Sequence, residues 1–345
     1  MDMDGDGRSP PAVTLEEVAR RAGVSPSTVS RILNGTARVR ESKRRAVERA
    51  IADLNYRPNV MARGLAGGRS MSVGVITQDI ASPFYNETLK GIEDSLAVGG
   101  YAPLFVSGHW NKAKENERME LLSARRVDGV IVLTGSIDDA ALLKYAQRLP
   151  LVITGRNLRG PNVVSIQLAN EQAAFDATQY LIEQGHTRIA HIAGPSSHLD
   201  AQERLAGYRR ALRQAKLPVD ERLVAIGDFN EATGLLALNQ LLESRISFTA
   251  LFVANDQMAY GARLALYRKG IRVPEDVSLI GFDDLPASLY TTPPLTTVRQ
   301  PAYDIGMAAG GAMVRMIQGQ EVSLPELPLQ IIVRESTQRL RGPSY

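Results

Sequence analysis

The residues that could carry chemistry lie mainly where apolar runs end. Asp283 and Asp284 directly follow a run that ends at Phe282, and paired carboxylates at a strand end could bind a metal or act as acid and base. No histidine or third carboxylate accompanies them, the sequence has no cysteine, and its four histidines are not at metal-ligand spacing. It also has no Walker loop, no GxGxxG after a strand and no serine elbow. We therefore predict a protein that is not an enzyme and holds no metal or cofactor.

A larger set of polar and aromatic side chains also follows apolar runs. In open α/β sheets, ligands bind outside the carboxyl ends of the strands, where these side chains would lie. Guanidinium, amide and carboxylate groups are donors and acceptors for hydroxyls, and an aromatic ring can cover the C–H face of a polyol. We therefore predict a small carbohydrate-like ligand. The candidate binding residues are Asp79, Phe84, Tyr85, Arg156, Arg204, Phe229, Asn255 and Asp283.

Alternating apolar strands and amphipathic helices must position these residues. Helices are predicted over 87–98 and 112–126. Strands are predicted at 73–77, 103–106, 129–133, 151–153, 189–193, 249–253 and 277–282. Near-continuous apolar strands between helices are typical of doubly wound parallel sheets, an α/β fold with both faces covered. Roughly 275 residues of this pattern exceed one core, so we predict two lobes with the ligand in the cleft between them.

The charge of the chain is concentrated near its beginning. The 345 residues include 40 Lys and Arg and 37 Asp and Glu, a net charge of +3. Residues 12–69 alone hold twelve bases and five acids, whereas 1–11 and 70–345 each carry a net −2. A small basic module before a nearly neutral body is the electrostatic footprint of a nucleic-acid-binding head. A solvated basic surface would give the same charge balance.

Local signals in the basic module predict two short helices and a tight turn. Thr14 and Glu17 form the capping-box pattern that begins a helix, and Gly23 can take the positive φ that ends one. Ser25 followed by Pro26 then begins a second helix. Two helices joined by a three-residue turn form a helix-turn-helix, and a third amphipathic helix is expected over 41–54.

The second helix is unusually polar for a member of a plain three-helix bundle, which is the alternative interpretation. Small or hydrogen-bonding side chains of this kind suit base edges and phosphates in a major groove. They are Ser27, Thr28, Ser30, Arg31 and Asn34. We therefore favour DNA binding.

Several stretches of the sequence resemble the lactose/galactose-repressor (LacI/GalR) family of bacterial transcriptional regulators. Residues 13–35 read VTLEEVARRAGVSPSTVSRILNG, and LNYRPN at 54–59 is followed by ARGLA at 62–66. The likeness continues with ERLAGY at 203–208, VANDQM at 253–258, GFDD at 281–284 and PPLTT at 293–297. It implies a helix-turn-helix headpiece and a periplasmic-binding-protein-like sensor whose chain crosses three times between its lobes.

The resemblance also implies a domain organisation. It comprises a disordered tail at 1–11, a DNA-binding headpiece at 12–57, a hinge helix or linker at 58–69, and an effector-binding and dimerisation domain at 70–345. The N-lobe would cover about 70–168 and 299–328, and the C-lobe about 169–298 and 329–345.

By this resemblance, residues 25–34 form the recognition helix and Leu65 of the hinge wedges into a minor-groove step. The hinge is too short to be stable alone and Gly64 weakens it further, so we expect it to order only when held. An ordinary linker is the alternative, and Gly64 departs from the family's longer side chain. The implied DNA contacts are Thr14, Ser25, Pro26, Ser27, Thr28, Ser30, Arg31, Asn34, Asn59, Arg63 and Leu65.

The resemblance further implies that Arg204, Asn255 and Asp283 bind sugar hydroxyls and that Phe229 stacks on the sugar ring. Gly155 departs from the Asp that is common there, so the hydroxyl pattern stays open. Each residue also has a structural alternative. Arg204 could pair with Asp200, Phe229 could belong to the core, and Trp110, the only tryptophan, could cap the cleft or lie in a surface loop.

We thus predict a repressor of carbohydrate-utilisation genes that binds a palindromic operator as a homodimer and responds to a sugar-like effector. The sequence begins without a signal peptide and has no apolar run of about 18 residues, so we expect a cytoplasmic protein that does not bind membranes. A transport protein is disfavoured by the basic head, and a sugar kinase by the missing nucleotide motif. Effector identity, the choice between inducer and corepressor, the operator sequence and assembly beyond a dimer stay open.

Overall fold

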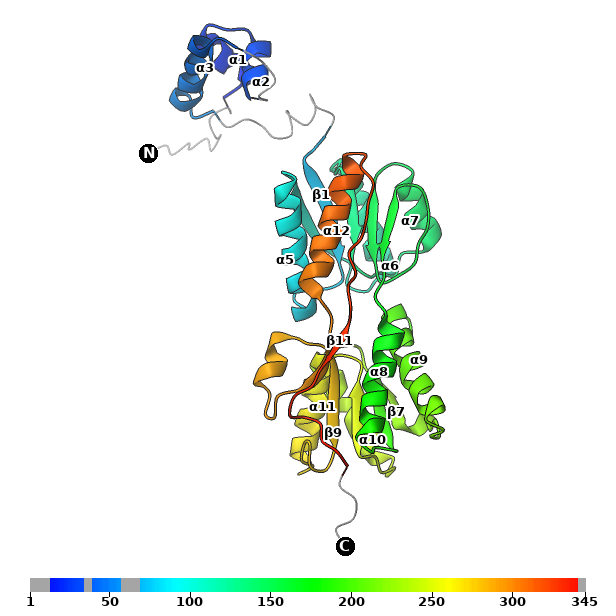
Figure 1. Cartoon of the computed structure of the whole chain (residues 1–345). Coiled ribbons are helices and arrows are strands. Elements are labelled where there is room, and N and C mark those ends of the chain that lie inside the picture. The colour runs from blue at the N-terminus through cyan, green and yellow to red at the C-terminus, as the bar shows by residue number, and fades with distance from the viewer. Residues whose placement is uncertain (1–12, 34–38, 57–68, 341–345) are drawn as a thin grey trace, which may run out of the picture. The chain divides into compact units, whose positions relative to one another are not determined.

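The computed structural model describes residues 13–33, 39–56 and 69–340 (Figure 1). The chain divides into two compact units, Met1–Ser70 and Met71–Tyr345, and each is described by itself. The predicted tail and nearly all of the predicted hinge lie outside the described residues. The same holds for four predicted DNA contacts, Asn34, Asn59, Arg63 and Leu65.

The first unit contains the three predicted helices, α1 (Leu15–Ala22), α2 (Pro26–Leu33) and α3 (Glu41–Asp53). The capping box is confirmed, because the Thr14 hydroxyl accepts from the Glu17 backbone N–H at 3.3 Å and the Glu17 carboxylate accepts from the Thr14 N–H at 2.8 Å. Gly23 ends α1 with φ of +66°. A small apolar core that includes the fully buried side chains of Val18 and Val47 holds the helices together.

The second unit contains two sheets. The first consists of the parallel strands β1 (Ser72–Thr77), β2 (Ala102–Ser107), β3 (Gly129–Val132), β4 (Leu151–Thr154) and β5 (Val163–Ile166). Their spatial order is β2-β1-β3-β4-β5. The reversal of strand order at β1 is the mark of a doubly wound sheet, whose ligand sites lie at its strand ends.

The second sheet consists of β6 (Ile189–Ala193), β7 (Val224–Ile226), β8 (Ala250–Val253), β9 (Ser278–Asp283), β10 (Thr296–Arg299) and β11 (Gln330–Ile332). Their order is β11-β10-β9-β8-β6-β7, and the sheet is parallel except that β11 runs antiparallel to β10. The strands predicted from their apolar runs are therefore confirmed within one or two residues, and β5, β7, β10 and β11 were not predicted.

Helices cover both faces of each sheet, as expected for strands that are apolar on both sides. On the first sheet, α5 (Pro83–Val98) and α12 (Ala302–Ile317) pack on one face, and α6 (Lys112–Ala124) and α7 (Asp139–Ala146) on the other. On the second, α8 (Asn170–Glu183) and α9 (Leu199–Gln214) oppose α10 (Glu231–Glu243) and α11 (Asp256–Arg268). Two short 3₁₀ helices span Glu221–Leu223 and Pro286–Tyr290.

The chain passes between the two sheets three times, as the family resemblance implies. It leaves the first sheet after β5, returns from β10 to form α12, and comes back to the second sheet in β11 (Figure 1). Helix α12 fits closely against α5 because glycines face each other there. A Cβ on Gly91 would lie 2.2 Å from the Tyr303 carbonyl oxygen, and one on Gly306 would lie 2.1 Å from that of Thr88.

Within the described residues, we find no helix of the length and apolarity that crossing a membrane requires. The same residues contain no group of three or more His, Cys, Asp or Glu side chains that could hold a metal ion. The predicted acid pair at Asp283 and Asp284 is therefore not part of a described metal cluster.

Candidate functional site

Helix α2 presents a polar, exposed face opposite its buried residue Val29. The Ser25 hydroxyl accepts from the Thr28 backbone N–H at 3.3 Å and so caps the helix, with Pro26 at its first position. The Arg31 Nε donates to the Ser27 carbonyl oxygen at 3.3 Å, and its side chain lies at the surface. This is the arrangement expected of a helix whose first turns face a groove of DNA.

The predicted DNA contacts that the structure describes all lie on the first two helices or at their starts. Ser25, Pro26, Ser27 and Arg31 are exposed, and Thr28 and Ser30 are half-buried. Thr14 is exposed too, although its hydroxyl is already engaged in the cap of α1.

Seven of the eight predicted effector residues line one cleft between the two sheets, with a volume of about 700 Å³. They follow strand ends of both sheets, because three of them come after β1 of the first sheet and four come after β6, β7 and β8 or at the end of β9 of the second. The seven are Asp79, Phe84, Tyr85, Arg204, Phe229, Asn255 and Asp283. The structure therefore brings seven residues chosen by the strand-end argument together at one cleft.

Arg204 is the cation of the cleft floor. Its side chain extends from α9 and is only 4% exposed, and its guanidinium lies 3.8 Å above the ring of Phe282. It donates from Nε to the Asn170 side-chain oxygen at 3.0 Å and from Nη1 to the Ala254 carbonyl oxygen at 2.7 Å. These bonds fix the group while leaving further N–H donors for a ligand.

The alternative that Arg204 pairs directly with Asp200 is not what the structure shows. Asn170 lies between them, since its Nδ2 donates to Asp200 Oδ1 at 3.1 Å while its Oδ1 accepts from Arg204. The carboxylate nearest to the guanidinium is instead Asp283, whose Oδ1 is 3.9 Å from Nη1. A buried polar network thus fixes the position of the Arg204 side chain in the cleft.

Asp283 ends β9 and points its carboxyl group into this network. Its backbone has φ of +122° and its Oδ1 accepts from Gln300 Nε2 at 2.7 Å. Burial raises the pKa of the Asp283 carboxyl to about 8, although the nearby Arg204 guanidinium opposes this effect. At neutral pH the group can therefore both donate to and accept from a ligand hydroxyl.

Phe229 and Asn255 are joined to each other on the second sheet's side of the cleft. Asn255 caps α11 by accepting from the Met258 N–H at 3.0 Å, and its Nδ2 donates to the Phe229 carbonyl oxygen at 2.8 Å. The Phe229 ring packs partly against the core and partly over Gly194, where a Cβ would lie 2.4 Å from the ring. Phe229 thus both packs against the core and lines the cleft.

The first sheet contributes the turn after β1 and the start of α5. Asp79 Oδ1 accepts from the Ala81 N–H at 2.8 Å and holds that turn. The rings of Phe84 and Tyr85 meet edge to face at 5.3 Å. Burial raises the pKa of the Tyr85 hydroxyl well above its usual value, so this group enters the cleft as a neutral donor.

Arg156 does not join the cleft, contrary to the prediction. Its guanidinium donates to the carbonyl oxygens of Gly135 and Ile137, the latter at 2.7 Å, and to Asp139 Oδ1 at 3.0 Å. These acceptors belong to the loop after β3 and draw the side chain into a neighbouring hollow of about 530 Å³. Its position after β4 was correct, but the adjacent loop decides its direction.

Further residues outside the predicted effector set line the cleft and obey the same strand-end rule. Trp110 follows β2 and stacks on His198, which follows β6, with ring centroids 4.0 Å apart. Of the two alternatives for Trp110, the structure supports the position in the cleft wall. The other lining residues that were missed include Asp200, Asp228, Glu231, Gln257 and Gln300.

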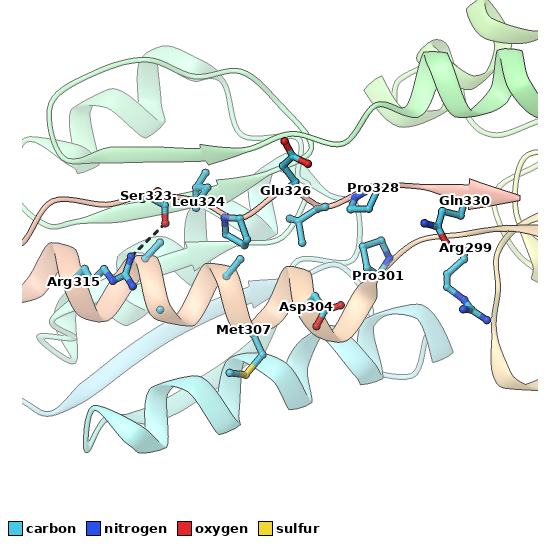
Figure 2. Close-up of a pocket in the computed structure, with 15 residues that line it drawn as sticks. Arg299, Pro301, Asp304, Met307, Arg315, Ser323, Leu324, Glu326, Pro328 and Gln330 are labelled. Atoms are coloured by element: carbon cyan, nitrogen blue, oxygen red, sulfur yellow. Dashed lines mark hydrogen bonds between the residues drawn. The ribbon is translucent and has the colours of Figure 1, made fainter.

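A separate groove of about 800 Å³ lies between α12 and the segment 323–330 (Figure 2). Arg315 Nη1 donates to the Ser323 carbonyl oxygen at 3.3 Å near one end, and Arg299 and Gln330 lie at the other. None of the predicted effector residues lines it. This groove is larger than the cleft, but buried polar groups converge in the cleft, and this favours the cleft as the ligand site.

Two family models match the chain. Residues 14–59 match the bacterial regulatory proteins of the lacI family, and residues 70–336 match the periplasmic binding proteins and sugar-binding domain of the LacI family. Catabolite control protein A of Priestia megaterium is 36% identical over 329 residues, which cover 94% of this chain and 99% of that protein.

Solved structures agree over nearly the whole chain. The lac repressor dimer bound to operator and the anti-inducer ONPF has a TM-score of 0.85 at 32% identity and covers 95% of this chain and 99% of its own. A complex of the transcriptional regulator CelR with cellobiose has a TM-score of 0.70 at 36% identity, with 94% and 99% covered. The matching proteins are regulators rather than enzymes, so the predicted class is confirmed. The chain belongs to the LacI family of bacterial DNA-binding transcriptional regulators.

Proposed function

We propose that this regulator is a repressor of carbohydrate-utilisation genes, which binds a palindromic operator as a homodimer and whose DNA affinity changes when a small neutral sugar enters the cleft. The domain limits expected from the sequence are part of this proposal. The observation that carries it is the convergence of Arg204, Asp283, Asn255 and Phe229 on one cleft at the strand ends of two sheets.

The chemistry of the cleft supports a polyol as the ligand. Arg204 supplies fixed donors, Asp283 supplies a carboxyl that can donate and accept, and Phe229 supplies an apolar face. A ligand that leaves such buried groups unpaired loses affinity, so hydroxyls at matching positions are selected. The CelR relative, whose structure is a cellobiose complex, supports the same ligand class.

The charges around the cleft favour a neutral sugar over a sugar phosphate. Among the described residues that line it, Arg204 is the one Arg or Lys, and it already faces Asp283. Even when Asp283 is left out, the lining carboxyl groups outnumber it, and they are Asp79, Asp200, Asp228 and Glu231. A phosphate dianion in this cleft would meet more repulsion than attraction.

The DNA-binding half rests on the first unit and on symmetry. The exposed polar face of α2 reads one half-site of the operator. A two-fold symmetric dimer matches a palindromic operator because each protomer contacts an equivalent half-site. The lac repressor relative is described as a dimer bound to operator, which supports this assembly.

The test uses the full chain in two steps. In vitro selection from a random DNA library yields the operator, and an inverted repeat is expected. A thermal-shift screen against neutral sugars and sugar phosphates is then repeated with the selected DNA, and at least one neutral sugar should raise the melting temperature and change DNA affinity.

Arg204→Met is the variant for this screen, and Arg268→Met, which lies at the end of α11 outside the cleft, is its matched control. We expect the first to abolish the sugar response and the second to keep it. Selection of a non-repeated DNA sequence contradicts the dimer. A screen in which no sugar changes the melting temperature or the DNA affinity contradicts the sensor.

A further inference from the structure

Two hollows of the second unit share one wall. The cleft of about 700 Å³, the first compartment, and the hollow of about 530 Å³ that contains Arg156, the second compartment, are both lined by Trp110, Ser197 and His198. Trp110 follows β2 of the first sheet and His198 follows β6 of the second, so the wall is built from both lobes. The hollows are therefore two compartments of one interlobe space.

The wall consists of stacked rings. Trp110 and His198 have centroids 4.0 Å apart and planes inclined by 23°, which is van der Waals contact. His198 continues the stack toward Phe229, with centroids 5.6 Å apart and an inclination of 22°. No ligand ring fits between Trp110 and His198 while they touch, so the stack separates the two compartments where both are lined by these rings.

Trp110 is presented by an unusual backbone. His109 and Trp110 have φ of +54° and +52°, a left-handed conformation that is uncommon for residues other than glycine. It is fixed by Gln78, a fully buried side chain whose Oε1 accepts from the Trp110 N–H at 2.9 Å while its Nε2 donates to the Thr134 carbonyl oxygen at 2.5 Å. Unfavourable backbone that buried partners maintain is a mark of a functional position.

The loops on both sides of the wall are set by a second buried group. Glu115 is fully buried and accepts from the N–H groups of Ser136 at 2.7 Å and Ile137 at 3.1 Å. It also packs against Gly108, where a Cβ would lie 2.5 Å from its side chain. The Trp110 loop and the loop after β3 are thus formed before any ligand arrives, so the wall is preorganised.

The second compartment has the groups to contact a further sugar ring. Arg156 is held at its edge by three oxygen atoms and keeps additional N–H donors, and the hydroxyl of Thr134 and the carboxylate of Asp139 line the same space. Donors and acceptors around a volume of 530 Å³ suit hydroxyl groups, and the volume is typical of small-molecule sites.

We infer that Trp110 and His198 determine effector length: their stack confines the effector to one sugar ring in the first compartment, and the second compartment receives a second ring when the stack is removed. This inference rests on the proposed function, because it needs a sugar in the first compartment. It adds two residues that limit which sugars bind, and a subsite with Arg156 at its edge.

The test compares neutral sugars of increasing length with the full chain. Glucose, cellobiose and cellotriose, and galactose and lactose, are titrated calorimetrically into the native chain and into His198→Ala, Trp110→Ala and Trp110→Phe. We expect the native chain to prefer one-ring sugars and both alanine variants to raise the ratio of two-ring to one-ring affinity at least tenfold. Trp110→Phe keeps an aromatic stack and should keep the native ratio.

A second readout needs no ligand. Trp110 is the only tryptophan, so its fluorescence reports on the stack directly, and His198→Ala should shift its emission to longer wavelength. His109→Asn is the matched control, because it changes the exposed neighbouring histidine without touching the stack and should leave emission and affinity ratio unchanged.

The inference is overturned if the alanine variants keep the native affinity ratio, if the native chain already prefers two-ring sugars, or if His198→Ala leaves the emission unchanged. If the native chain binds one-ring sugars but the variants keep the native affinity ratio, the length limit is wrong and the proposed function stands. Absence of any sugar response in the native chain and in all variants contradicts the proposed function, and the inference fails with it.

Discussion

Gln300 Nε2 donates a hydrogen bond of 2.7 Å to Asp283 Oδ1, and this bond joins the floor of the cleft to the segment that leads from β10 to α12. The Gln300 backbone N–H also donates to the Asp283 carbonyl oxygen, at 3.3 Å. Gln300 follows β10 of the second sheet and precedes α12, which packs on the first. A ligand that moves the Asp283 carboxyl therefore acts directly on a connection between the lobes.

Gln300→Leu tests this connection. The variant has a similar volume but leaves the buried Asp283 oxygen without its donor, which costs about 1–3 kcal/mol for a buried acceptor. We expect sugar affinity in calorimetry to fall about tenfold and the sugar-dependent change in DNA affinity to shrink further. Gln318→Leu, at the exposed end of α12, is the control and should match the native chain. Native behaviour of Gln300→Leu in both assays would show that the bond transmits nothing.

Gly194→Ala tests the placement of the Phe229 ring. A Cβ at Gly194 would lie 2.4 Å from the ring, so the ring must move within the cleft. We expect a loss of sugar affinity of at least tenfold with a loss of stability of about 1–3 kcal/mol, the usual cost of overpacking. Chemical denaturation and sugar titration measure the two effects.

Gly311→Ala is the matched control for this substitution. Gly311 lies in α12, and its new Cβ would make only an ordinary contact, 3.6 Å from the hydroxyl oxygen of Ser95 in α5. It should keep sugar affinity and gain up to about 1 kcal/mol of stability, because alanine favours a helix more than glycine does. If Gly194→Ala binds sugar as tightly as this control, the position of Phe229 does not matter for the ligand.

His191 makes stability depend on acid pH. The imidazole is fully buried between Tyr208 and Phe252, with ring centroids 4.9 and 4.7 Å away, and burial lowers the pKa of His191 to about 3. Between pH 6.5 and about 3 the unfolded chain binds a proton that the folded chain does not. The stability that neutral His191 contributes is therefore present above pH 6.5 and is lost as pH falls through this window.

The expected slope is about 1.4 kcal/mol per pH unit from this one group. Urea unfolding of the native chain at a series of pH values between 7 and 4 should be compared with that of His191→Leu, whose dependence should be shallower by this amount. The exposed His109→Asn serves as the control and should retain the native slope. Equal slopes for His191→Leu and the native chain would mean that this imidazole is protonated in the folded state.

The parts of the fold that could be predicted from the sequence depend on local interactions. Thr14 and Glu17 are three residues apart, and their reciprocal bonds formed as expected. Buried strands such as Ile189–Ala193 are apolar except for His191, so their limits were correct. In contrast, β7 and β11 have three residues each and lie at the edges of the second sheet, so their apolar stretches are too short to predict a strand.

The parts of the site that could not be predicted depend on contacts between distant residues. Glu115 belongs to an amphipathic helix, yet it is fully buried because the N–H groups of Ser136 and Ile137 bind its carboxylate. The carbonyl groups that draw Arg156 out of the cleft come from another strand's loop. The stack of Trp110 on His198 exists only when two lobes meet, although both residues follow strands.

Ser27 offers the sharpest test of the DNA-binding surface, because it is exposed on the first turn of α2. Its hydroxyl lies 3.0 Å from that of Ser25, and its carbonyl oxygen accepts from Arg31 Nε at 3.3 Å. Because the bond to Arg31 uses the backbone of Ser27, a change of the Ser27 side chain leaves this bond in place. Ser27→Asn introduces an amide that pairs with adenine. We expect in vitro selection with this variant to change the preferred base at one position of each half-site, with a discrimination of about 1–3 kcal/mol. Ser42→Ala, exposed on α3, should select the native operator. A Ser27→Asn variant that binds every sequence more weakly but keeps the native preference would assign Ser27 to the phosphate backbone instead of the bases.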